Sequence, residues 1–283
     1  MNNNYQIKKD LRALLIDFQD STKELSNKCG VSRRTLNNIL SESNQPSYET
    51  LDKIYSFAYD SGYRFNKTKE ELFKENTRNI VLFHGASHMI EEIKHNGSRE
   101  TCDFGKGFYL GESYFQASSF VYDDPFSSVY VFSFDISDLN VVELYSDLDW
   151  MIIVCYFRKM LTKYNNHPII TNLINKIKDA DVIIAPIADN KMFNIMRQFG
   201  EEEITSLEAI HSLSSSGLGK QYVLKTEKAI SKLKEIERLF ISTSERITIK
   251  SGLEERSKEI DTKLKLSKRE FKGEGQFIDE IFK

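Results

Sequence analysis

Cysteine is scarce in this chain of 283 residues, which has only Cys29, Cys102 and Cys155, and these lie far apart. An odd number of cysteines without a Cys-x-x-Cys pair predicts neither a disulfide framework nor a zinc site, so we expect no metal. No run of about 18 apolar residues is present, as a membrane-spanning helix would need. The first residues, MNNNYQIKKD, lack the apolar stretch of a signal peptide. We therefore expect a cytoplasmic protein with no membrane partner.

An excess of charge of one sign is also absent, because the formal net charge is −3. Residues 1–66 carry nine Lys or Arg against eight Asp or Glu, and residues 226–283 carry fourteen against twelve, which leaves the middle acidic. This balance excludes tight nonspecific binding to nucleic acid through net charge alone. Hydrophobic residues make up 40% of the chain and aromatic residues 12%, which is enough to build a core.

Residues 7–62 show helical periodicity and no strand pattern. Apolar residues from Leu11 to Phe18 recur at i, i+3, i+4 and i+7, the spacing of one buried helix face. Gly30 is suited to end the second helix in the left-handed conformation, and Ser32 is suited to cap the third. The pattern therefore predicts a helix, a tight turn and another helix.

From residue 79 the pattern changes to short β-type runs separated by helical patterns. The runs are 80–83, 108–110, 129–134, 182–184 and 222–224, and the helical patterns are 113–121, 146–164, 190–199 and 205–214. Thr205 and Glu208 have the spacing of a capping box. The sequence predicts an α+β protein with an all-α domain at 1–66, a polar linker at 67–78, an α+β domain at 79–228 and a C-terminal helical extension at 229–283.

The segment from Leu25 to Leu40, with the Pro46–Leu51 stretch after it, resembles the helix-turn-helix of phage-repressor-like DNA-binding domains. In such a domain the second helix of the motif enters the major groove, where Arg pairs with guanine and Asn with adenine. The resemblance places these residues on or near DNA: Arg33, Arg34, Thr35, Asn37 and Asn38. The alternative is that the two arginines are solvated charges on a helical bundle that contacts another protein, such as an antitoxin.

Three short segments of the α+β region place polar or aromatic residues beside strands and glycines. The run 80–83 leads into His84, which a glycine follows directly. The segment Asp-Phe-Gly-Lys-Gly-Phe-Tyr frees the backbone with two glycines before Tyr109. The segment Gly-Lys-Gln-Tyr-Val-Leu opens a strand with Gln221. Each segment alone is a weak signal, since a strand-end histidine or a glycine turn is more often structural.

The order of the three segments resembles the H-Y-E branch of the ADP-ribosyltransferases, which includes the diphtheria-toxin and poly-ADP-ribose polymerase types. The resemblance covers roughly residues 79–228 and implies a split-sheet α+β fold that uses NAD as co-substrate. It implies that His84 binds a ribose hydroxyl and that the Gly85 backbone holds the nicotinamide carboxamide. Gly107 would let the backbone approach the cofactor beside Tyr109, which would stack on the nicotinamide ring.

The sequence departs from this branch at the third catalytic position, where Gln221 stands in place of a glutamate. An amide can orient a ribose hydroxyl, but it stabilises a developing positive charge less than a carboxylate does. The departure therefore disfavours polymer formation and favours slow transfer of a single unit, hydrolysis or binding alone.

Other acidic residues are weaker candidates for the site. Asp189 follows a buried strand run and is a candidate for the rim of the NAD site, or else a helix cap. Asp103 and Lys106 flank the glycine turn and would meet NAD phosphates or the acceptor, or else lie on the surface. The run 201–203 imitates the Glu-x-Glu of the arginine-modifying toxins, but it precedes a capped helix and is better explained as a solvated loop.

The sequence leaves three activities open. The first is a mono-ADP-ribosyltransferase, acting as the toxin of a toxin–antitoxin pair or as a phage-defence effector on a protein or nucleic-acid acceptor. The second is an NAD glycohydrolase with water as the acceptor. The third is a DNA-binding regulator whose ADP-ribosyltransferase-like domain binds NAD or a related ligand without transfer. A homodimer would suit site-specific binding by a helical domain of nearly neutral charge.

Overall fold

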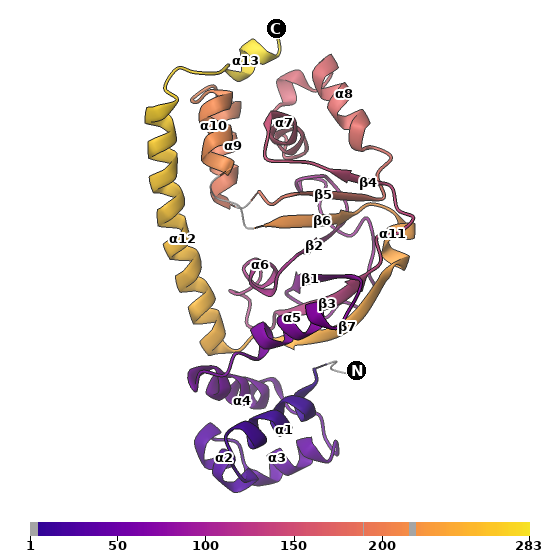
Figure 1. The fold of residues 1–283 in the computed structure, drawn as a ribbon, viewed down its shortest axis with the longest axis vertical. Helices are drawn as coiled ribbons and strands as arrows, with labels where there is room; N and C mark the ends of the chain where they lie inside the picture. The colour runs from indigo at the N-terminus through magenta and orange to yellow at the C-terminus, as the bar shows by residue number, and fades with distance from the viewer. Residues whose placement is uncertain (1–4, 189, 215–218) are drawn as a thin grey trace. The chain divides into compact units, whose positions relative to one another are not determined.

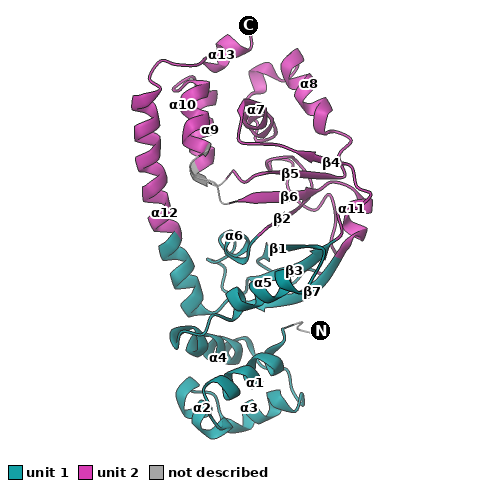
Figure 2. Cartoon of the chain, in the orientation of Figure 1, with its two compact units in different colours: residues 1–90, 113–134, 234–252 teal, residues 91–112, 135–233, 253–283 magenta. Residues whose placement is uncertain are grey.

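The protein is an α+β protein, as the sequence predicts. The computed structural model describes residues 5–188, 190–214 and 219–283. Contacts divide the chain into two compact units, which Figure 2 shows in teal and magenta. Unit 1 comprises residues 1–90, 113–134 and 234–252, and unit 2 comprises residues 91–112, 135–233 and 253–283. None of the described helices is both long and apolar enough to cross a membrane.

Unit 1 contains the N-terminal helices and three of the strands (Figure 1). Its helices are α1 (Ile7–Asp17), α2 (Thr22–Cys29), α3 (Arg33–Leu40), α4 (Tyr48–Asp60), α5 (Phe65–Glu75), α6 (Tyr114–Ser118) and the start of α12 (Thr243–Glu270). Its strands are β1 (Ile80–Ala86), β3 (Ser128–Phe134) and β7 (Leu233–Phe240), in the order β1-β3-β7. Strands β1 and β3 are antiparallel, with His84 opposite Tyr130.

The turn between α2 and α3 has the chemistry that the sequence predicts. Gly30 ends α2 with φ at 68°, in the left-handed region that a residue without Cβ adopts at little cost. The Ser32 side chain accepts a hydrogen bond from the Thr35 backbone N–H at 3.1 Å, which caps α3. Leu25 and Leu36, one from each helix, are fully buried in the core of the N-terminal helices. Both capping predictions are thus confirmed.

The segment expected to be a linker, 67–78, instead lies largely in helix α5. This helix buries polar side chains. Asn66 is 4% exposed, and its amide donates to the Tyr114 hydroxyl at 2.9 Å and to the Phe240 carbonyl oxygen at 2.9 Å. Only Phe65 and Asn66 of α5 are fully buried, so residues 67–75 have the composition of a solvated linker and apolar periodicity could not identify the helix.

The prediction of an entirely helical extension at 229–283 is wrong at residues 233–240, which form strand β7. The apolar residues of this segment match a helical spacing, but its last four residues, from Glu237 to Phe240, are all buried, which strand packing explains. A charged cluster joins β7 to the N-terminal helices. The Lys69 ammonium lies 2.6 Å from Asp10 of α1 and 2.5 Å from Glu237. Asp10 also accepts a hydrogen bond from the Tyr55 hydroxyl of α4 at 2.5 Å.

Unit 2 contains the other four strands, in the order β4-β5-β6-β2. The strands are β2 (Phe108–Gly111), β4 (Val141–Glu143), β5 (Val182–Pro186) and β6 (Lys220–Leu224). The helices are α7 (Leu148–Phe157), α8 (Pro168–Ile177), α9 (Asn190–Gly200), α10 (Ser206–Ser214), α11 (Glu227–Ser231), α13 (Ile278–Ile281), the 3-10 helix η1 (Thr162–Tyr164) and the rest of α12. Strand β5 pairs parallel with β4 and antiparallel with β6, so the sheet of this unit is mixed.

The core of unit 2 is built on the very apolar helix α7. Trp150 and Ile153 of α7 pack with Phe199 of α9 and Ile183 of β5, and all four are fully buried. The predicted capping box is present before α10, because the Thr205 hydroxyl and the Glu208 carboxylate each accept the other residue's backbone N–H.

Candidate active site

Of the six residues that the sequence places at a candidate NAD site, the structure describes five, and these fall in two groups. His84 and Gly85 lie in β1 of unit 1. Gly107, Tyr109 and Gln221 lie in unit 2, where the antiparallel β2–β6 ladder brings them together. Tyr109 is opposite Val223, and Gln221 is opposite Gly111. Asp189, the sixth expected residue, lies outside the described residues.

His84 and Gly85 lie within β1, because this strand extends to Ala86. The His84 side chain is half-buried. A Cβ on Gly85 would lie 2.3 Å from the carbonyl oxygen of Ala117 in α6, a separation that real Cβ atoms essentially never show. Glycine is thus required at this position because a helix carbonyl packs directly on the strand. This close packing is a structural reason for the glycine of the His-Gly pair that does not depend on any ligand.

Several hydrogen bonds hold the glycine turn before β2 in place. Gly105 has φ at +70°, and its carbonyl oxygen accepts a hydrogen bond from the Tyr109 hydroxyl at 2.6 Å. The same hydroxyl accepts the Phe104 backbone N–H at 3.1 Å. Lys225 donates to the carbonyl oxygens of Phe104, at 2.6 Å, and of Lys106. The sequence suggested a flexible turn, whereas the structure holds its backbone in one conformation.

Burial changes the acidity of two groups at this turn. It raises the pKa of the Tyr109 hydroxyl well above its ordinary value, so the group stays protonated and remains a donor. It lowers the pKa of the Lys225 ammonium, which is partly withdrawn from water beneath the turn. A Cβ on Gly107 would lie 2.5 Å from Cγ1 of Val223, so glycine also permits the close approach of the turn to β6.

Gln221 lies in a buried polar cluster that the sequence did not predict. Its side-chain amide donates to Oδ2 of Asp103 at 2.8 Å and to the carbonyl oxygen of Pro186 at 2.9 Å. Both partners are acceptors, so they fix which end of the amide is nitrogen and use both of its N–H groups. Gln221 can therefore offer a ligand only its Oε1 acceptor.

Asp103 is the centre of this cluster and is 5% exposed, so the expectation of a surface turn residue is wrong. Its Oδ1 accepts a hydrogen bond from Nε of Arg158 at 2.7 Å, and its Oδ2 also accepts the Ala188 backbone N–H at 3.3 Å. The Arg158 guanidinium donates in addition to the Ala188 carbonyl oxygen at 2.9 Å. The negative charge of Asp103 is thus compensated by an arginine.

The sequence did not identify Arg158 as a site residue, because it follows an apolar helix and is 55 positions from Asp103. Nothing local in the sequence signals that the two residues meet. Lys106, by contrast, lies at the surface in an ion pair with Glu100 at 3.2 Å, as a turn residue would. The run 201–203 is exposed and follows α9, as expected of a solvated loop.

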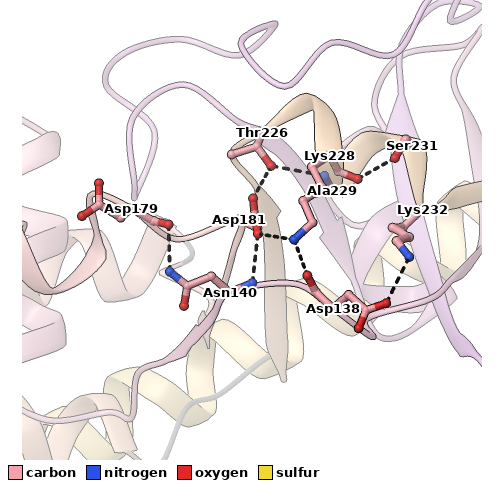
Figure 3. A network of polar contacts seen from close by, with 9 residues as sticks. All are labelled: Asp138, Asn140, Asp179, Asp181, Thr226, Lys228, Ala229, Ser231 and Lys232. Atoms are coloured by element: carbon pink, nitrogen blue, oxygen red, sulfur yellow. Dashed lines mark hydrogen bonds and ion pairs between the residues drawn. The ribbon is translucent and has the colours of Figure 1, made fainter.

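A second polar network fixes the opposite end of the β5–β6 ladder (Figure 3). Asp181 accepts hydrogen bonds from the Thr226 hydroxyl at 2.7 Å and from the Asn140 backbone N–H at 2.9 Å. Both bonds lower the pKa of the Asp181 carboxyl, and the bond from the Asn140 backbone has the larger effect. Because Val182 is paired with Leu224 and Ala185 with Gln221, the network anchors the strands at the end away from Gln221.

The surface expected to meet DNA is formed by α3. Arg33, Arg34 and Asn37 are exposed, whereas Thr35 and Asn38 are half-buried. The Thr35 hydroxyl shares a hydrogen bond with that of Ser32 at 2.8 Å, so it helps to cap the helix. The α3 surface therefore presents two cations and one amide to solvent.

Within the described ranges, no group of three or more His, Cys, Asp or Glu side chains is arranged to hold a metal ion. The candidate residues supply hydrogen-bond donors and acceptors, an aromatic ring and a carboxylate whose charge an arginine compensates. This combination suits recognition of a polar organic ligand.

The fold is that of an α+β protein, and along the sequence the candidate NAD-site residues run from His84 in β1 to Gln221 in β6. The chain belongs to the DUF3990 family, described as proteins of unknown function, whose family model matches residues 80–234. This match starts at β1 and ends just inside β7, so it includes every candidate NAD-site residue and excludes α1 to α5. No curated protein and no solved structure matches the chain.

Proposed function

We propose that the chain is a mono-ADP-ribosyltransferase that uses NAD as its co-substrate. The observation that carries the proposal is the fixed amide of Gln221, which lies on the strand paired with that of Tyr109 and can present only an acceptor oxygen. An acceptor at this place suits a ribose hydroxyl, which the glutamate of the resembled family binds. The Tyr109 ring would stack on nicotinamide, and His84 would bind a second ribose hydroxyl.

In the proposed reaction, the bond between nicotinamide and C1′ of the ribose breaks, and the bonding electrons leave with nicotinamide. The ring, positively charged in NAD, becomes neutral, while C1′ becomes oxocarbenium-like. A nucleophilic group of the acceptor then attacks C1′ and releases its proton to water. The neutral Gln221 stabilises the positive C1′ less than a carboxylate would, so slow transfer of one unit is the expected outcome.

The test uses the purified full chain with NAD labelled in its adenine, mixed with cell lysate. Transfer predicts label on a protein or nucleic acid, and loss of that label in His84→Ala and Tyr109→Ala. Matched controls are His95→Ala, which removes a surface pair with Glu227, and Tyr145→Ala, whose side chain is 63% exposed; both should retain transfer. Free ADP-ribose without labelled macromolecule would identify an NAD glycohydrolase instead. Absence of any NAD binding would contradict the proposal.

The second candidate function is a regulator that binds NAD or a related ligand without cleaving it. Gln221 favours this function, since an amide held by Asp103 and Pro186 positions a ligand but carries no charge of its own. Saturable NAD binding without nicotinamide release, measured by calorimetry and by chromatography of the products, would support it. The same outcome would overturn the transferase proposal.

We also propose that α2 and α3 form a helix-turn-helix that binds DNA site-specifically or docks an antitoxin, so that the effector acts in a toxin–antitoxin or phage-defence setting. The exposed Arg33, Arg34 and Asn37 support this proposal. A gel-shift assay with the DNA upstream of the protein's own coding sequence, at low salt, tests DNA binding. Arg34→Ala should abolish a specific shift, and Lys53→Ala, on exposed α4 surface, should not. No shift by the intact protein would reject this role.

A further inference from the structure

The Gln221 side chain keeps one hydrogen-bonding atom for a ligand. Gln221 is only 5% exposed, and both N–H groups of its amide are used, by Oδ2 of Asp103 and by the carbonyl oxygen of Pro186. Among the residues that the structure describes, none donates a hydrogen bond to its Oε1. A buried acceptor without a donor is unfavourable, and a ligand that donates to it would relieve this.

Two acceptors set the direction of the Gln221 amide. Reversing it would place Oε1 against the carboxylate of Asp103 and the carbonyl oxygen of Pro186, so that two repulsive contacts would replace two hydrogen bonds. Because one acceptor is charged, the reversed amide should be at least about a hundredfold less populated. Asp103 supplies most of this preference, since only one neutral acceptor would remain without it.

Asp103 is itself held in one orientation by Arg158. The Nε of Arg158 donates to Oδ1 of Asp103 at 2.7 Å, while Oδ2 accepts from Gln221 at 2.8 Å. The same guanidinium donates to the Ala188 carbonyl oxygen at 2.9 Å, and the Ala188 N–H donates to Oδ2 of Asp103 at 3.3 Å. Asp103, Arg158 and Ala188 thus form a closed ring of hydrogen bonds, so the carboxylate cannot turn without breaking at least one of them.

Arg158 is anchored by the core of unit 2. It directly follows α7, in which the residues from Trp150 to Cys155 are all buried. Its side chain is 20% exposed, and its guanidinium lies 5.0 Å from the centre of the Phe193 ring of α9. The chain of contacts therefore runs from a buried helix through Arg158 and Asp103 to Gln221.

We infer that Asp103 and Arg158 are positioning residues, which hold Gln221 so that its Oε1 faces the ligand. Neither residue needs to touch the ligand. The ligand must then present a hydrogen-bond donor at this point, as a ribose hydroxyl does, whereas a carbonyl or phosphate oxygen would be repelled. The inference rests on the proposed function for the identity of the ligand, NAD, but the direction of the amide can be measured without it.

Nuclear magnetic resonance of the free full chain tests the direction of the amide. The side-chain N–H signals of Gln221 are identified by their absence in Gln221→Ala. We expect these protons to exchange with solvent at least about tenfold more slowly than those of an exposed side-chain amide, and Asp103→Asn to remove this protection. The control is Asp149→Asn, which alters an exposed ion pair with Lys176 and should leave the exchange unchanged. Rapid exchange in the unaltered protein would overturn the inference.

Calorimetric titration with NAD tests whether both residues act through Gln221. Asp103→Asn should weaken NAD binding by about tenfold, and Arg158→Lys by about threefold, since lysine keeps the cation but cannot make both bonds of the guanidinium. Gln221→Ala should weaken binding as well, and neither change should weaken it further in that background. A purely structural role would lower the affinity alike in both backgrounds. Arg197→Lys, in an exposed ion pair with Glu201, is the control and should bind NAD unchanged.

The outcomes separate this inference from the proposed function. Losses of affinity that simply add in the double variants would overturn the inference, while NAD binding by the unaltered protein would still support the function. Absence of NAD binding, together with a slowly exchanging Gln221 amide that Asp103→Asn releases, would overturn the proposed function and support the positioning of Gln221. Arg158→Lys is the milder change and provides the same test if Asp103→Asn does not fold.

Discussion

The side-chain amide of Gln221 and the carboxylate of Asp103 are joined by a buried hydrogen bond of 2.8 Å. This contact fits an amide at position 221, where the H-Y-E branch proposed for this chain has a glutamate. A glutamate there would place a second carboxylate against Asp103 and the Pro186 carbonyl oxygen, with no proton to share at neutral pH. The neighbours of Gln221 therefore fit an amide.

Gln221→Glu should lower the free energy of unfolding by about 2–4 kcal/mol, because three acceptors would then meet without a donor. Adding Asp103→Asn should recover part of this loss, since an amide at position 103 can donate to the new carboxylate and Arg158 keeps a negative charge nearby. Urea unfolding of both single variants and the double variant measures the coupling. Strictly additive losses would contradict the proposed geometry. Gln221→Glu alone should not raise NAD turnover.

Tyr109→Phe should separate the two contributions of this residue. The variant keeps the ring but loses the bonds to Gly105 and Phe104, so unfolding should become easier by about 1–2 kcal/mol. NAD binding that depends on ring stacking should persist in Tyr109→Phe and disappear in Tyr109→Ala. Tyr145→Phe is the control and should change neither quantity, because its side chain is 63% exposed. Stability unaffected by Tyr109→Phe would show that the hydroxyl contributes nothing to the turn.

Gly85→Ala should destabilise the protein by about 1–3 kcal/mol, because the new Cβ would lie 2.3 Å from a backbone oxygen of α6. The matched control is Gly97→Ala, whose Cβ would have its nearest neighbour at 3.4 Å and should be tolerated. Thermal unfolding of the two variants gives the comparison. If the variants unfold at the same temperature, the close approach of α6 to β1 is not what requires glycine.

Glu245 should make stability depend on pH. Burial raises the pKa of its carboxyl to about 7, against hydrogen bonds from Tyr114 and Asn66 that lower it. Since the folded state favours the protonated carboxyl, this contribution is fully present below the ordinary pKa of 4.5 and is lost as the pH rises through about 7. Unfolding between about pH 5 and about pH 8 should show a loss of about 1–3 kcal/mol.

Glu245→Gln is the control for this prediction, because glutamine is neutral throughout that range. The variant should flatten the pH profile and be at least as stable as the unaltered protein at the higher pH. An unchanged slope in Glu245→Gln would assign the pH dependence to other groups.

Local signals predicted local structure well. Gly30 and Ser32 were recognised because turn and capping chemistry depends only on neighbouring residues. Strands β1, β2, β3, β5 and β6 were found from short runs of β-branched and aromatic residues, whereas the three-residue strand β4 was not predicted. Helix α5 and strand β7 were missed because both bury charged or polar side chains, such as Lys69 and Glu237. Their burial depends on partners distant in the sequence.

In the candidate site, too, local motifs could be predicted from the sequence and contacts between distant residues could not. Tyr109 and Gln221 could be named from short motifs, and the structure pairs their strands. Asp103 and Arg158 could not be paired from the sequence, since their contact spans 55 positions and is fixed only when the strands assemble. Sequence reasoning named Tyr109, Gln221 and Asp103, but it missed Arg158 and the contact that joins Asp103 to Gln221.

The ion pairs of Lys69 with Asp10 and with Glu237 bear on how freely the chain can be divided into modules. The family match ends at residue 234, before Glu237, so a protein trimmed to the matched region would lose most of β7 and all three partners of this cluster. Conversely, helices α1 to α4 expressed alone would leave the buried Asp10 without Lys69, which lies in α5. Residues from distant parts of the chain thus hold helices α1 to α4 in unit 1, and a graft of these helices onto another protein would need to carry α5 and β7 with them.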